Sequence, residues 1–291
     1  MLSQIEIKRT LERRIREIPT LPSVASKVMQ ILENPRSSAA DVERVIMYDQ
    51  AMATRVLKLV NSAYYGFPRR ISTVSQAVVI LGFVTVKNLI LSISVADFFV
   101  MLGKTRIFNR AELWRHSVGT AVAARILARK AHFPQLEEVF MAGLLHDIGK
   151  VILDHYFPQE FAQVIQLAQE KKISIYEAEL EVIGISHAVV GRWIADHWNL
   201  PQLLVEVINY HHQPFENKDY WATTALVHVA DIIARQARIG SGGDDVQPTI
   251  RPNVLEWLRI KDQDFQEVQK QLELELLQAD DLMNIGLERG A

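Results

Sequence analysis

Apolar residues recur at intervals of three and four along almost the whole 291-residue chain, and this spacing limits the fold more than any other feature. Such intervals gather the apolar side chains on one face of an α-helix, whereas a half-buried strand would alternate apolar and polar residues. No convincing alternating run bounded by hairpin turns occurs. Helix-start patterns agree with this, because Ser38 and Asp41 have capping-box spacing and Asp49 precedes the apolar run QAMATRVLKLVNSA. The sequence therefore predicts an all-α fold.

The composition excludes several kinds of site. With 49% hydrophobic and 23% charged residues, the chain has enough apolar material for one large core or two smaller ones. The absence of cysteine excludes disulfides, thiolate metal sites and cysteine nucleophiles, and it fits a reducing compartment. A formal net charge of −2 disfavours nucleic acid as a partner, although VSQAVVILGFVTVKNLI has the pattern of a helix–turn–helix.

The sequence also predicts a cytoplasmic protein without membrane segments. The apolar run at residues 84–102 has nearly membrane-spanning length, but Lys87 and Asp97 interrupt it, so we expect a buried helix. The first residues, MLSQIEIKRTLERRIREIP, are charged throughout and lack the apolar block of a secretory signal.

One segment, GLLHDIGK at residues 143–150, brings polar residues into an apolar pattern that predicts a single helix over residues 135–154. Further histidines and one aspartate occupy apolar or helix-end positions elsewhere. A lone histidine on an apolar face is usually a hydrogen-bonded core residue, and this remains the alternative at each position. Together, however, so many buried polar groups would lack partners unless a metal cluster engaged them. The residues concerned are His116, His146, Asp147, His187, His211, His212 and Asp231.

Four of these residues carry a family resemblance. His116, His146 with Asp147, and Asp231 resemble the H…HD…D signature of the HD superfamily of metal-dependent phosphohydrolases. The segments IPTLPSVASKVMQIL, DQAMATRVLKLVNSAYYG and ISTVSQAVVILGFVTVKNLIL resemble the HDOD branch of that superfamily, and the similarity runs from about residue 15 to about 235. The resemblance implies an HD-domain-like helical bundle, preceded by an HDOD-type N-terminal helical subdomain, in a protein of bacterial signal transduction.

The resemblance also assigns roles within the cluster. Many HDOD domains lack the metal ligands, and this chain retains them. The H…HD…D residues match the first metal site, with Asp147 as a bridge between two ions. The second-metal ligands of the related HD-GYP cyclic-dinucleotide phosphodiesterases are matched by His187, His211 and His212, and their HDIGK lysine is matched by Lys150. The GYP signature itself is missing, because QPFENKDYW follows His212.

Besides nucleic-acid binding, which the net charge disfavours, two functions stay open at this stage. The first is a phosphohydrolase or phosphodiesterase that acts on a nucleotide or cyclic nucleotide, with Asp147 and Lys150 as catalytic residues. It would use two divalent transition-metal ions, with iron or manganese favoured and zinc or nickel as alternatives. The second is a non-catalytic regulatory HDOD module that binds a signalling-protein partner or a small ligand.

The chain is expected to have three parts. Residues 1–108 form the N-terminal helical part, residues 109–240 form the HD-type region with the metal site, and residues 241–291 contain a linker and a C-terminal amphipathic helix. The glycines of GSGGDD, residues 240–245, predict a flexible connection. The acidic amphipathic segment DFQEVQKQLELELLQADDLM either packs on its own domain or binds a partner, and the pattern does not decide between them.

Overall fold

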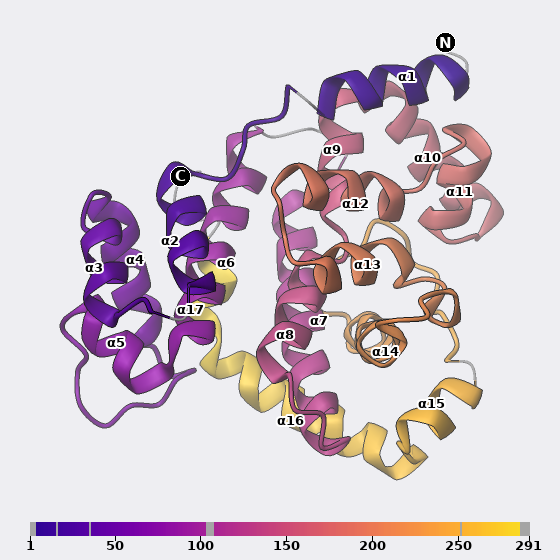
Figure 1. The fold of residues 1–291 in the computed structure, drawn as a ribbon. Helices are drawn as coiled ribbons and strands as arrows, with labels where there is room; N and C mark the ends of the chain where they lie inside the picture. The colour runs from indigo at the N-terminus through magenta and orange to yellow at the C-terminus, as the bar shows by residue number, and fades with distance from the viewer. Residues whose placement is uncertain (1–3, 16, 35, 103–107, 251, 286–291) are drawn as a thin grey trace. The chain divides into compact units, whose positions relative to one another are not determined.

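A computed structural model describes residues 4–15, 17–34, 36–102, 108–250 and 252–285, and all regular structure in these ranges is helical (Figure 1). The prediction of an all-α fold is confirmed. None of the described helices is long and apolar enough to cross a membrane. The chain forms two compact units: a larger one from residues 1–19 and 102–272, and a smaller one from residues 20–101 and 273–291. Each unit therefore combines two separate stretches of sequence, whereas the three parts expected from the sequence are each continuous.

The smaller unit consists of short capped helices around a long apolar one. The capping box is present at the start of α3, and the Asp49 carboxylate accepts a hydrogen bond from the Met52 N–H at 2.9 Å at the start of α4. Asp97, which interrupts the apolar run of α6, pairs with Arg55 at 2.6 Å. The helices are α2 (Ser23–Glu33), α3 (Ala39–Ile46), α4 (Gln50–Val60), α5 (Val74–Leu81), α6 (Phe83–Met101) and α17 (Asp280–Asn284).

The larger unit is built around α7, whose alanines allow close packing and most of whose residues are buried. Both α8 and α14 pack against α7, and α12 packs against α9 and α13. The helices are α1 (Gln4–Ile15), α7 (Arg110–Lys130), α8 (Leu136–Leu145), α9 (Ile148–Tyr156), α10 (Pro158–Lys171), α11 (Ile175–Val182), α12 (His187–His197), α13 (Gln202–Tyr210), η1 (Pro214–Glu216), α14 (Trp221–Gln236) and α15 (Pro252–Leu258), with the start of α16 (Asp262–Gln278).

The C-terminal region contains α15, α16 and α17 rather than one amphipathic helix. Lys130 at the end of α7 contacts Asp264 at 3.2 Å and Glu267 at 2.6 Å, so the first part of α16 packs on the larger unit. Val268 and Leu272 on the same helix are fully buried. At least this part of the acidic segment thus packs on its own chain.

Two glycines bring helices of the larger unit into backbone contact. A Cβ atom added at Gly143 of α8 would lie 2.9 Å from the Cα atom of Ala121 in α7. A Cβ atom added at Gly149 of α9 would lie 2.0 Å from the His187 carbonyl oxygen and 2.7 Å from the Gly191 nitrogen in α12. Only glycine permits these approaches. Both glycines flank the polar segment at residues 146–147 and hold it against the neighbouring helices.

We therefore expect Gly149→Ala to lower the free energy of unfolding by about 3 kcal/mol, because the added methyl group meets backbone atoms that cannot turn aside. Gly191→Ala is the matched comparison and should cost about 1 kcal/mol, since its new Cβ would first meet the Cγ2 atom of the Ile208 side chain, at 2.8 Å. Urea denaturation of both variants measures the difference. Equal losses would contradict the proposed backbone contact.

Candidate metal centre

The helix expected over residues 135–154 is interrupted at its polar pair. Helix α8 ends at Leu145 and α9 begins at Ile148, while Asp147 has φ −99° and ψ 8°, outside the α-helical region. The prediction of one continuous helix was wrong, because periodicity does not report a single residue that leaves helical geometry between two apolar segments. The junction places His146 and Asp147 between α7, α12 and α13 instead of along one helix face.

Backbone carbonyl groups orient two of the histidine rings. The His146 Nδ1 atom lies 2.7 Å from the Gly143 oxygen, and the His211 Nδ1 atom lies 2.8 Å from the Ile208 oxygen. A carbonyl oxygen only accepts hydrogen bonds, so Nδ1 must be the protonated nitrogen in each ring. In the neutral ring the Nε2 lone pair is then available and faces the interior, as a metal ligand requires.

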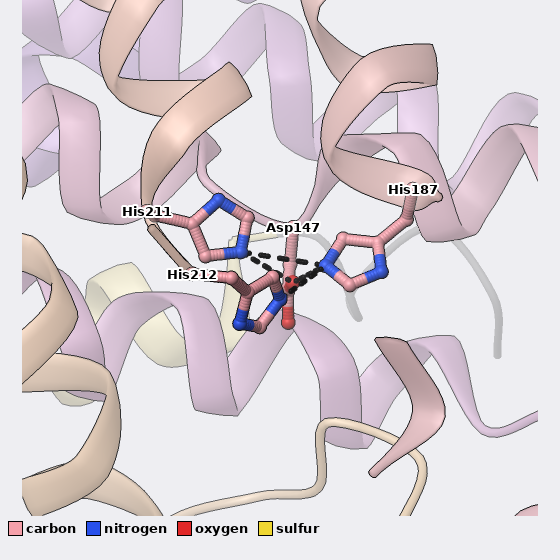
Figure 2. Close-up of side chains that lie close together, drawn as sticks. All are labelled: Asp147, His187, His211 and His212. Atoms are coloured by element: carbon pink, nitrogen blue, oxygen red, sulfur yellow. Dashed lines mark hydrogen bonds and ion pairs between the residues drawn. The ribbon is translucent and has the colours of Figure 1, made fainter. Parts of the chain in front are cut away.

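The carboxylate of Asp147 lies beside His187, His211 and His212 (Figure 2), and a second group of histidines, His116 and His146, also lies close to it. Its Oδ1 atom is 3.1 Å from Nε2 of His187 and 3.8 Å from Nε2 of His211. Its Oδ2 atom is 3.3 Å from Nε2 of His146 and 3.7 Å from Nε2 of His116. One carboxylate thus presents a different oxygen to each group, which is the arrangement of a bridging ligand.

The seven candidate ligands fall into two compact sets. Within each set the ligand atoms lie within 4.8 Å of one another. His187 Nε2 is 3.0 Å from His212 Nε2 and 3.3 Å from His211 Nε2. Ligands bound to one ion at about 2.1 Å lie roughly 3 to 3.5 Å apart, so these spacings suit a shared cation. The sets are Asp147, His187, His211 and His212, and His116, His146 and Asp231.

Several of these ligand atoms are buried without a hydrogen bond. They are Nε2 of His116, Nε2 of His146, Oδ1 of Asp147 and Oδ1 of Asp231. His116 Nε2 is 3.0 Å from Asp231 Oδ1, yet the two atoms are not aligned for a hydrogen bond. Each such group costs about 1 to 3 kcal/mol when it is left without a partner. The residues therefore fit a bound metal, which would satisfy these atoms together.

The electrostatics at His116, His211 and Asp147 favour the protonation states that bind metal. Burial lowers the pKa of His116, and burial together with the neighbouring His146 lowers the pKa of His211 well below its usual value. Burial alone would raise the pKa of Asp147, but His146 and Lys150 outweigh it and hold this pKa well below the ordinary range. Neutral imidazoles and an ionised carboxylate are the forms that coordinate divalent cations.

Lys150 lies inside the centre rather than in solvent. Its side chain is 1% exposed, and its Nζ atom donates a hydrogen bond to Asp147 Oδ2 at 2.6 Å. A buried ammonium group needs a compensating charge, and the Asp147 carboxylate supplies it.

Glu179 of α11 is a site residue that the sequence pattern did not reveal. Its Oε2 atom accepts a hydrogen bond from the His187 backbone N–H at 2.7 Å and lies 2.7 Å from His187 Nδ1. Burial would lower the pKa of His187, but the Glu179 and Asp147 carboxylates together outweigh burial and raise it. A carboxylate behind a ligating imidazole orients the ring and makes it a stronger ligand. In the sequence, YEAELEV has only the pattern of an acidic helix face.

A family comparison agrees with this geometry. The HDOD domain model matches residues 18–214, more than half of the chain. The chain belongs to the HDOD family. Over 224 residues it is 29% identical to an uncharacterized protein of Treponema pallidum. These residues make up 76% of this HDOD chain and 43% of the relative. This chain thus spans less than half the length of that curated relative.

Two solved structures share the fold along their whole length. An HDOD domain protein of unknown function from Geobacter sulfurreducens is 29% identical with a TM-score of 0.74, over 97% of this chain and 98% of the other. An inferred phosphohydrolase from Shewanella amazonensis is 25% identical with a TM-score of 0.73, over 95% of this chain and 96% of the other. The HDOD assignment from the sequence is thus confirmed.

Glu179→Ala should weaken metal binding by about 10- to 100-fold, because His187 loses the group that fixes its orientation. Glu181→Ala is the matched control, since Glu181 lies on the same helix with an exposed side chain that pairs with Lys171. Titration of each metal-free variant with manganese measures the affinity. If both variants bound manganese equally well, Glu179 would have no positioning role.

Proposed function

We propose that this HDOD protein is a metal-dependent phosphohydrolase of bacterial signal transduction that cleaves a phosphoester of a nucleotide or cyclic nucleotide. The observation that carries the proposal is the Asp147 carboxylate between two sets of histidines, because two cations held by one carboxylate are suited to phosphoester hydrolysis. The expected location of the protein, in the cytoplasm, and its signalling partner stay predictions.

In this proposal the two ligand sets would hold the ions, and Asp147 would be the residue that serves both sets. Histidine and carboxylate ligands suit several divalent transition metals, of which we favour iron or manganese, with zinc and nickel as alternatives. Such ions supply Lewis acidity that favours the attack of water on phosphorus. The helices supply the fixed positions of the ligands, and the buried surroundings strengthen every charge interaction in the centre.

Lys150 is the residue that we expect to act on the reacting phosphate. Its ammonium group lies 2.6 Å from Asp147 Oδ2, so it is held next to both ligand sets. From this position it can neutralise charge that develops on a phosphoryl oxygen. Burial of the side chain keeps this cation free of competing solvent.

A non-catalytic regulatory role is the second candidate. It is favoured by the missing GYP sequence after His212, where the chain forms the short helix η1 instead. It is also favoured by exposed apolar side chains on the smaller unit, including Tyr48 at 82% and Val79 at 76% exposed. Exposed apolar side chains of this kind suit a protein partner. Metal binding is compatible with both candidates, whereas turnover distinguishes them.

Asp147→Ala should remove both ions, because the bridge is the one residue that serves both sets. His187→Ala should remove one ion and leave the set of His116, His146 and Asp231 occupied. Metal content per chain is measured by mass spectrometry on protein purified without chelator or affinity nickel. The wild type should hold about two ions, His187→Ala about one, and Asp147→Ala none. Asp219→Ala, at an exposed position, is the control. Full metal content in Asp147→Ala would contradict the bridge.

Lys150→Met should lower turnover by about 100-fold while the metal content is kept, because the charge near the reacting phosphate is lost and the volume is nearly preserved. The measurement is a phosphatase and phosphodiesterase screen of nucleotides and cyclic nucleotides with added manganese or iron. Lys218→Met, at an exposed position, controls for the loss of a lysine. Absence of turnover by the metal-loaded wild type across the panel would favour the regulatory role.

A further inference from the structure

The glycine-rich segment after α14 lies against the metal centre. We call Gly240 to Val246 the strap. The Ser241 N–H donates a hydrogen bond to the Glu112 carbonyl oxygen of α7 at 3.1 Å. A Cβ atom at Gly240 would lie 2.2 Å from the same oxygen, so the strap contacts α7 directly. The expected flexible connection is thus anchored at its first residues.

The middle of the strap approaches the functional atoms of the centre. Gly242 is buried, and a Cβ atom added there would lie 3.4 Å from Lys150 Nζ, 3.5 Å from Arg235 Nη1 and 3.7 Å from His116 Nε2. Three nitrogen atoms of basic side chains therefore surround one backbone position. His116 Nε2 is also one of the buried ligand atoms without a hydrogen bond.

Asp244 anchors the other end of the strap. Its Oδ1 atom accepts hydrogen bonds from Arg235 Nη2 and, at 2.9 Å, from the Val246 N–H. Its Oδ2 atom accepts from the Ile175 N–H, the first of α11, at 2.9 Å. The carboxylate is 2% exposed and Arg235 is 9% exposed, so this anion is enclosed by the guanidinium and the start of a helix.

Arg235 belongs to the same helix as a metal ligand. It follows Asp231 by four residues on α14, so both side chains lie on one helix face. A guanidinium group offers several donors in one plane, and the first N–H groups of a helix attract anions. These are the groups that bind phosphate oxygens in proteins. In this structure the Arg235 guanidinium and the Ile175 N–H both donate hydrogen bonds to the Asp244 carboxylate.

We propose that Arg235 and the Ile175 N–H form a phosphate subsite beside the metal centre, which Asp244 fills until a phosphate group displaces it and releases the strap. The proposal rests on the proposed phosphohydrolase function, since it names a second contact for the phosphorylated substrate of that centre. A phosphate carries more charge than the single carboxylate that it replaces. Displacement of Asp244 also moves Gly242 away from Lys150 and His116 and opens the centre.

The test uses the metal-loaded full chain and inorganic phosphate as the probe, at constant ionic strength, with binding measured by calorimetry. Asp244→Asn should bind phosphate about tenfold more tightly than wild type, because the competing carboxylate is gone. The neighbouring Asp245→Asn is the matched control, since that residue is exposed and should leave the affinity unchanged. In the double variant Asp244→Asn with Arg235→Gln, the gain should disappear, which separates the subsite from phosphate bound at the metals.

A second measurement needs no variant. In wild-type protein, phosphate should accelerate hydrogen exchange at the Ser241 and Val246 amides, whose N–H groups donate in the closed strap. Equal phosphate affinity of Asp244→Asn and Asp245→Asn, a gain that survives loss of Arg235, or unchanged exchange in the strap would each overturn the subsite. None of these results depends on hydrolysis, so a failure of the proposed activity would be recognised separately, by absent turnover.

Discussion

The structure of the larger unit depends on one buried carboxylate. Asp147 is almost fully buried, and an isolated charge in such a place would be strongly destabilising. Lys150 compensates for it through a hydrogen bond to Oδ2, and the chain leaves helical geometry at Asp147 itself. Glycines on both sides of the polar pair let α8 and α9 approach their neighbours at backbone distance. The helix break at Asp147, the close packing at the glycines and the ammonium group of Lys150 therefore all contribute to the burial of this carboxylate.

The imidazoles of His146, His187 and His211 are oriented by hydrogen-bond partners at their Nδ1 atoms. Carbonyl oxygens of the preceding helical turn orient His146 and His211, and Glu179 orients His187. Protonation of Nδ1 leaves the Nε2 lone pairs facing a common interior, where at short distance they repel one another. This repulsion is unfavourable, and several buried polar atoms of the same residues also lack hydrogen bonds. Such an arrangement is costly for a purely structural core and fits residues that bind metal.

The strap gives the centre a second state that the ligand geometry alone would not suggest. In the closed state Gly242 lies beside Lys150 and His116, and Asp244 satisfies Arg235. Opening of the centre and binding of phosphate would then be one event, because a phosphate group binds Arg235 only when it displaces Asp244 of the strap. This would link the catalytic and the regulatory interpretations of an HDOD protein, since control of the strap would control the centre.

The sequence by itself determined the helical class and the chemical types of the ligands. Apolar spacing is a local property of each helix, and His116, His146, His187 and Asp231 could be recognised because polar residues at apolar positions interrupt that spacing. It did not reveal the break at Asp147, the role of Glu179, or the pairing of Arg235 and Asp244, whose residue types are ordinary on solvated helices and in loops. Only the tertiary structure decided that the ligand atoms meet and that each Asp147 oxygen faces a different set. The physical reason is that convergence depends on how several helices pack, and this packing follows from contacts between segments far apart in the chain.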